Sequence, residues 1–149
     1  MTEKIYLDKW AAHGGQTIVQ ENRDAGRASE DVDNLVTKAL GVLQENGIYA
    51  CGLYLCSRSR DKEKEIAAVV NQTMVDLLAR LPFGWGRPPS LDPQTLLPYL
   101  SHTVAGDDKL ERVLLAKETL EQMLVYARYG AKAWKASLSG SDAGAEGGA

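Results

Sequence analysis

Apolar side chains recur every three or four positions along most of this chain, and this spacing constrains its fold more than any other feature. The clearest case is Lys62–Leu81, where the inward-facing positions are Ile66, Val69, Val70, Thr73, Leu77 and Leu78. β-Branched residues are sparse, whereas Ala, Leu, Glu and Lys, which favour helices, are common. The sequence therefore predicts an all-α protein.

The 149 residues suffice for one domain and hardly for two. We expect a single compact bundle of about six helices within residues 1–138, because periodic segments alternate with turn signals. The expected helices begin at Thr2 and Ser29, span Ile48–Cys56 and Lys62–Leu81, run from Asp92 to about Thr103, and from Asp108 to about Leu138. The tail, residues 139–149, lacks any large apolar residue and is predicted to be disordered.

The run IYACGLYLC, residues 48–56, is apolar at nearly every position, so periodicity cannot separate a buried strand from a buried helix. No second strand candidate lies nearby, which favours a helix. Because the segment is apolar all round, we expect it at the centre of the bundle. Leu53 of this segment and Leu124 of the last helix are predicted to be buried, and Leu→Ala at either position should cost about 2–5 kcal/mol.

The charge balance limits the classes of partner. Lys and Arg number 17 against 20 Asp and Glu, a net charge of −3, which excludes a globally basic nucleic-acid binder but allows a local basic patch. Two cysteines, Cys51 and Cys56, are too few for a secreted disulfide scaffold, so a cytoplasmic location is expected. The chain shows no signal-peptide pattern and no apolar stretch of membrane-spanning length.

Few residues point to catalysis or to a bound metal. The two histidines, His13 and His102, lie in no metal-like cluster, and the spacing of the two cysteines does not fit a zinc site. Asp107-Asp108 fits a helix start better than a metal pair. A small enzyme built on these acids and His102 remains one hypothesis, but no nucleophile–base pair supports it. We therefore expect a non-enzyme without cofactors.

Two basic groups are the candidate binding residues. Arg58, Arg60, Lys62 and Lys64 follow the apolar run, and Arg128, Lys132 and Lys135 are spaced to share one face of the last helix, beside Tyr129. One interpretation is a surface that contacts the backbone of nucleic acid. The other is a solvated helix face whose cations favour the helix C-terminus.

The order of several motifs resembles a known family. Glu45-Asn-Gly-Ile48 leads into the apolar run and then into basic residues. Leu97-Pro-Tyr-Leu100, Ala116-Lys-Glu-Thr-Leu120 and Tyr126-Ala-Arg-Tyr-Gly-Ala-Lys132 follow in order. Together these motifs, between Leu35 and Trp134, resemble the small α-helical subunit of type III-B (Cmr-type) CRISPR effector complexes. The family's last motif is often Trp-Leu-Lys-Arg-Phe, so Val125-Tyr-Ala-Arg-Tyr129 has one cation fewer.

The resemblance implies a non-catalytic structural role in antiviral defence. Such subunits stack in several copies beside the guide-bound backbone subunits and the large subunit, where target RNA pairs with guide RNA. It implies no membrane contact, and it makes a basic surface the candidate RNA contact. The candidate residues are Arg58, Arg60, Lys62, Lys117, Arg128, Lys132 and Lys135. The alternative is a self-associating helical adaptor or regulatory protein that never binds RNA.

Overall fold

The computed structural model describes the backbone of residues 2–147 and the side chains of residues 6–138. The all-α prediction is confirmed, since the described residues form six α-helices and one π-helical segment and contain no strand. The elements are α1 (Thr2–Asp24), α2 (Ser29–Asn46), α3 (Ile48–Cys56), α4 (Asp61–Arg80), α5 (Pro93–Pro98), η1 (Tyr99–Val104) and α6 (Leu110–Gly147). The described backbone continues α6 to Gly147, past the predicted end at about Leu138. The disorder predicted for residues 139–149 falls beyond the described side chains and stays a prediction.

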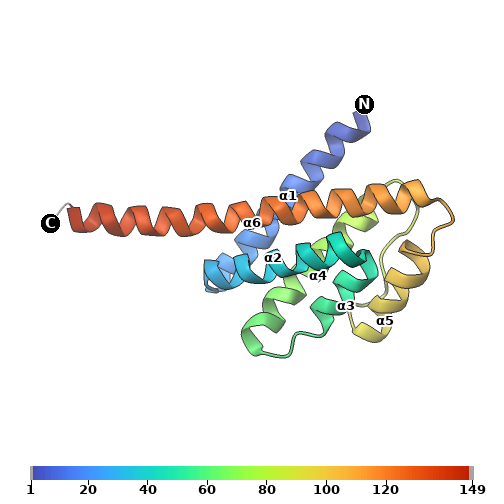
Figure 1. The fold of residues 1–149 in the computed structure, drawn as a ribbon, viewed down its shortest axis with the longest axis horizontal. Coiled ribbons are helices and arrows are strands. Elements are labelled where there is room, and N and C mark those ends of the chain that lie inside the picture. Colours follow the sequence, from blue (N-terminus) through green and yellow to red (C-terminus); the bar gives the residue numbers. More distant parts are fainter. Residues whose placement is uncertain (1, 148–149) are drawn as a thin grey trace.

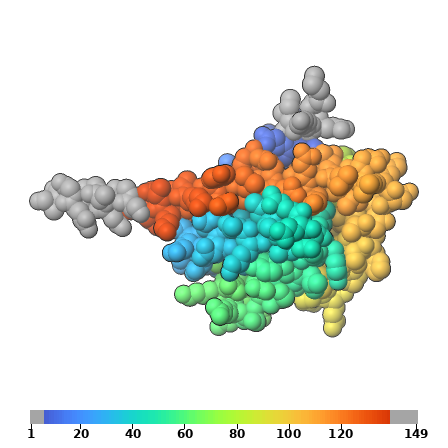
Figure 2. All heavy atoms as spheres, viewed as in Figure 1, coloured from blue at the N-terminus to red at the C-terminus, as the bar shows by residue number. Residues whose placement is uncertain are grey.

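The last helix, α6, organises the bundle. It packs against α1 and α2, and α4 packs against α1, α2 and α3 (Figure 1). Figure 2 shows α2 lying between α6 and the start of α4 on the face in view. The inward face of α6 is fully buried at Leu120, Met123 and Leu124, so the burial predicted for Leu124 is confirmed.

Helix α3, which the sequence predicted at the centre of the bundle, is buried on one side only. Helix α3 buries Ile48, Cys51 and Leu55, but Leu53 on its other side is 43% exposed, so the prediction of a buried Leu53 was wrong. The reason is geometric: α2, α4, α5 and η1 cover α3 on one side only. Apolar character all round does not require burial all round, and we expect truncation of Leu53 to cost far less than predicted.

The junction of α2 and α3 follows the sequence signal. Helix α2 ends at Asn46, and Gly47 adopts a φ of +97°, a conformation that a side chain would strain. The Gly47 N–H donates to the Leu43 carbonyl at 3.0 Å, and the Gly47 carbonyl accepts from the Cys51 N–H at 3.1 Å. One residue therefore ends the first helix and begins the next.

The segment after the proline-rich loop changes its winding at Pro98. The predicted helix from Asp92 is present, but its second half, η1, is a π-helix. The Ala105 N–H donates to the Leu100 carbonyl five residues earlier, at 2.9 Å. Proline lacks an N–H and crowds the turn before it, and the widened segment begins directly after Pro98.

Hydrogen bonds to the Asp107 carboxylate connect the start of α6 with the loop before α5. The carboxylate accepts hydrogen bonds from the Lys109 N–H and from the Trp85 indole N–H, both at 2.8 Å. These two bonds, with Arg112 at 3.6 Å, hold the pKa of Asp107 below its ordinary value. The predicted helix-start role of this acid agrees with these contacts.

The lowered pKa of Asp107 sets an expected pH dependence. A depressed carboxyl pKa adds stability that is present above the unfolded value of about 3.9 and is lost as pH falls through the folded value. Asp107→Asn should therefore unfold at lower urea concentration than the wild type at neutral pH, and the difference should shrink toward about pH 3. Equilibrium melts followed by Trp fluorescence measure this, and a difference independent of pH would contradict the assignment.

Candidate nucleic-acid interface

The three cations of the last helix share one face, as their spacing predicts, but that face meets acids of α2. Arg128 Nε lies 3.9 Å from Asp33 Oδ1, and Lys132 Nζ lies 3.3 Å from Asp33 Oδ2. Lys135 Nζ lies 4.0 Å from Glu30 Oε2. We call Arg128, Lys132 and Lys135 the α6 row. In the free chain its charge is partly balanced by α2.

These ion pairs are weak enough for another anion to replace the carboxylates. The side chains of Lys132 and Lys135 are 47% and 60% exposed, and pairs at such surfaces contribute only about 0–1 kcal/mol. A phosphate oxygen could take the place of either carboxylate at small cost. Tyr129, 62% exposed beside Arg128, offers an aromatic face at the same end of α6.

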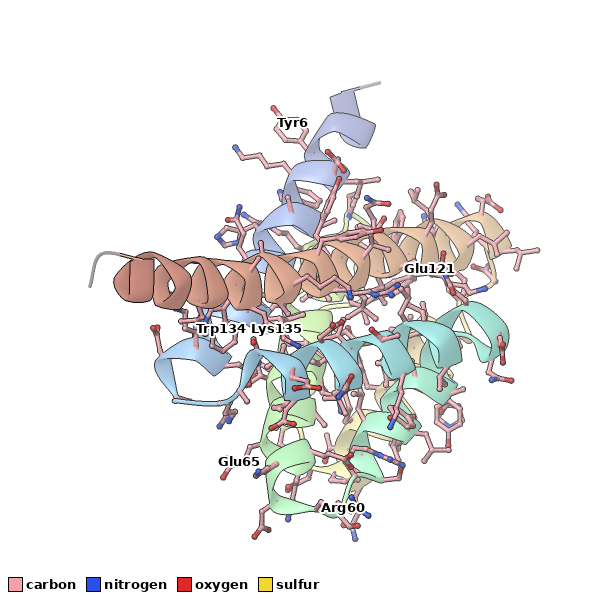
Figure 3. All side chains as sticks on the ribbon, turned by 60° about the vertical axis from the view of Figure 1, so that its left-hand side comes forward. Tyr6, Arg60, Glu65, Glu121, Trp134 and Lys135 are labelled. Carbon is pink, nitrogen blue, oxygen red and sulfur yellow. The ribbon has the colours of Figure 1, made fainter. Side chains whose placement is uncertain are left out.

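Lys117 has a structural partner. Its ammonium group donates to the Gln44 carbonyl at 3.2 Å and lies 3.7 Å from Glu121, which Figure 3 labels on α6. The Gln44 carbonyl belongs to the last turn of α2, where a cation favours the helix dipole. Of the candidate residues, Lys117 therefore has a clear role in joining α6 to α2.

The second basic group lies at the start of α4. The Arg58 guanidinium stacks 4.1 Å above the Tyr54 ring, donates to the Tyr54 carbonyl and lies 3.9 Å from Glu63. Arg60 and Lys62 are exposed and line a hollow of about 280 Å³ between α2 and α4. Lys38 of α2, which the sequence interpretation missed, joins them there, together with Asp31 and other polar residues.

The two groups flank α2 instead of forming one continuous patch. The α6 row meets Asp33 and Glu30, whereas Arg60 and Lys62 share their hollow with Asp31, so the outer ridge of α2 separates the two. Figure 3 shows this separation, with Lys135 beside the start of α2 and Arg60 beyond it. Glu30 and Asp31 lie in the first turn of α2, where the helix dipole favours acids, but the sequence alone does not show which cations they face.

The two cysteines and the possible metal ligands form no reactive or metal-binding cluster among the described residues. Cys51 is buried, which raises its pKa to about 12, and its thiol donates to the Ala39 carbonyl. Cys56 is half-buried, and both cysteines are free. Among the described residues, no three His, Cys, Asp or Glu side chains gather closely enough to hold a metal ion.

Comparison with protein-family models, curated proteins and solved structures finds no match to this chain. Within the described residues, no helix combines the length and the apolar character needed to cross a bilayer.

Proposed function

We propose that this chain is a non-catalytic small subunit of a type III, Cmr-type CRISPR effector complex in the cytoplasm. In this proposal several copies stack along the guide-bound backbone, beside the large subunit. The α6 row and the residues before α4 contact the sugar-phosphate backbone of target RNA or of the guide–target duplex. Pairing with the guide supplies sequence specificity, so the subunit needs only backbone contacts.

One observation carries this proposal: the motifs behind the resemblance lie on the turn, the helices and the exposed end of α6 described above. The Asn46-Gly47 turn leads into α3, an amphipathic α4 follows, and the final helix carries Tyr129 exposed between Arg128 and Lys132. An exposed aromatic ring beside two cations suits contact with ribose and phosphate.

Exposed apolar side chains support the stacking of copies. Leu110 and Leu114, one turn apart at the start of α6, are 67% and 53% exposed, and Tyr49 and Leu53 are exposed on α3. Contiguous exposed apolar patches mark protein contacts, whereas single exposed apolar residues are common on any surface. A monomer with a net charge of −3 offers few phosphate contacts, and stacking would multiply them.

The pairing of the α6 row with α2 also favours a second candidate function. All three cations of the row have an acidic neighbour within the chain, as expected for a helical adaptor that self-associates without RNA. The two functions differ in salt dependence, because counterion release weakens phosphate binding steeply and protein-only assembly need not follow.

The experiment substitutes Arg128→Ala and Lys132→Ala in the assembled complex and measures target affinity across salt concentrations. Each lost phosphate contact should flatten the slope of log affinity against log salt by about one, without changing sequence preference. Lys109→Ala, which removes the same charge just before the start of α6, is the matched control and should leave the slope unchanged. Unchanged slope and affinity in the double variant of an intact complex would assign these residues to protein contacts.

A further inference from the structure

A cleft between α1 and α4 brings together aromatic and cationic side chains that lie far apart in the sequence. Two adjoining hollows of about 340 and 380 Å³ share Trp10, His13 and Arg80 in their walls. Small-molecule sites commonly occupy about 300–1,000 Å³. We call this place the Trp10 cleft; its other charged or polar walls include Lys9, Gln16 and Arg87.

The cleft is positively charged although the whole chain is acidic. Lys9, Arg80 and Arg87 line it, and Asp76 is its one acidic wall residue. Asp76 is already paired with Arg87 and accepts a hydrogen bond from Gln72. Within the described side chains, Lys9 and Arg80 form no ion pair. Among the side chains of residues 6–138, the cleft thus has two cations without an acidic partner, unlike the α6 row.

The aromatic part of the cleft is held beside these cations. The Arg80 guanidinium lies 5.2 Å from the centroid of the Trp10 ring, and the Tyr6 ring stacks alongside Trp10 at 6.3 Å. The helix dipole accounts for a cation in the last turn of α4, where Arg80 lies, but not for Lys9, Trp10 and Tyr6 on α1. The cleft is lined by α1, α4 and Arg87, whereas the α6 row meets Asp33 and Glu30 of α2, so the two are separate sites.

We infer that the Trp10 cleft binds a nucleotide unit. The base takes the position over the Trp10 ring that the Arg80 guanidinium occupies in the free chain, and Arg80 turns with Lys9 to the phosphate. An aromatic side chain can stack on any base, because every base has a π-face. Lys and Arg side chains beside it can bind the phosphate group attached to the nucleoside. A nucleotide uses both features of the cleft, the Trp10 ring and the cations, whereas acidic side chains of a peptide would use the cations alone. The nucleotide unit belongs either to a free mononucleotide or to a single strand of RNA.

The test titrates the isolated full chain and follows the indole N–H signals of its three tryptophans by nuclear magnetic resonance. The probes are adenosine and uridine monophosphates, short single strands of each, and inorganic phosphate. We expect a nucleotide or a strand to shift the Trp10 signal while Trp85 and Trp134, which are buried, stay unchanged. Equal affinity for monophosphate and strand would identify the free nucleotide as the source; tighter binding of the strand would identify RNA.

Variants make the inference falsifiable. Trp10→Ala and, separately, Arg80→Gln should weaken binding at least tenfold. Arg80 is exposed, so its variant should keep the fold even if Trp10→Ala does not. Tyr49→Ala, which removes an exposed aromatic ring from α3 outside both the cleft and the α6 row, is the matched control. Tyr129→Ala tests α6 as the competing site.

Three results would overturn the inference: no binding of any nucleotide, equal binding of inorganic phosphate alone, or loss of binding in Tyr129→Ala but not in the cleft variants. The last result would place nucleic acid on α6, in agreement with the proposed function. Conversely, a cleft that binds nucleotides would stand even if the assembled complex showed no dependence on the α6 row.

Discussion

Replacing Leu124 by Ala should lower the free energy of unfolding by about 2–5 kcal/mol. Leu124 lies in the middle of α6 with no exposed surface, on the face that also buries Leu120 and Met123. This face contacts both α1 and α2, so the lost methyl groups leave a space that two helices would have to close together. Urea denaturation followed by circular dichroism measures the change.

Leu114→Ala is the control for this substitution. It removes the same atoms from the same helix, but Leu114 is 53% exposed, so the expected change is within about 0.5 kcal/mol. Similar losses in the two variants would show that the buried face of α6 has been misassigned.

Gly15→Ala should destabilise the protein by about 1–3 kcal/mol, although alanine favours helices. A methyl group at Gly15 would lie 2.8 Å from Tyr126 Cβ and 3.0 Å from the Ala127 backbone nitrogen. Because backbone atoms cannot move aside as a side chain can, α1 and α6 would have to separate. The same movement would strain the hydrogen bond that the Tyr126 hydroxyl donates to the Asp8 carboxylate, at 2.6 Å.

Gly41→Ala provides the opposite case in the same protein. Gly41 lies inside α2, and a methyl group there would meet no atom within 4 Å. Only the helix preference remains, so this variant should be stabilised by about 0.5–1 kcal/mol. Thermal melts of both variants should show a lower melting temperature for Gly15→Ala and a higher one for Gly41→Ala than for the wild type. Stabilisation of both would mean that α1 and α6 do not meet at Gly15.

The helices were predictable because their signals are local. Apolar spacing located α2 and α4, Asn46-Gly47 marked the end of α2, and Pro98 marked a change of winding. What local signals could not provide was packing. Gly14-Gly15 weakens a helix in isolation, yet α1 continues through the pair and uses it for close approach to α6. The burial of α3 likewise depends on which neighbours reach it.

The candidate site shows the same limit more sharply. The spacing of Arg128, Lys132 and Lys135 correctly predicts a shared face, since helix geometry alone determines it. That the face meets Asp33 and Glu30 depends on how α2 packs, about 100 residues earlier in the chain. The Trp10 cleft combines side chains from α1, the end of α4 and the following loop, so no sequence motif could reveal it.

The most direct test of the central claim is the RNA that the chain carries in its own cells. The tagged full-length chain would be purified at moderate salt, and the copurified RNA would be sequenced before and after ribonuclease treatment. The proposal predicts guide RNAs with repeat-derived ends, held together with backbone and large effector subunits. Recovery of the chain only with copies of itself or with proteins, without guide RNA, would contradict the proposal and favour the adaptor.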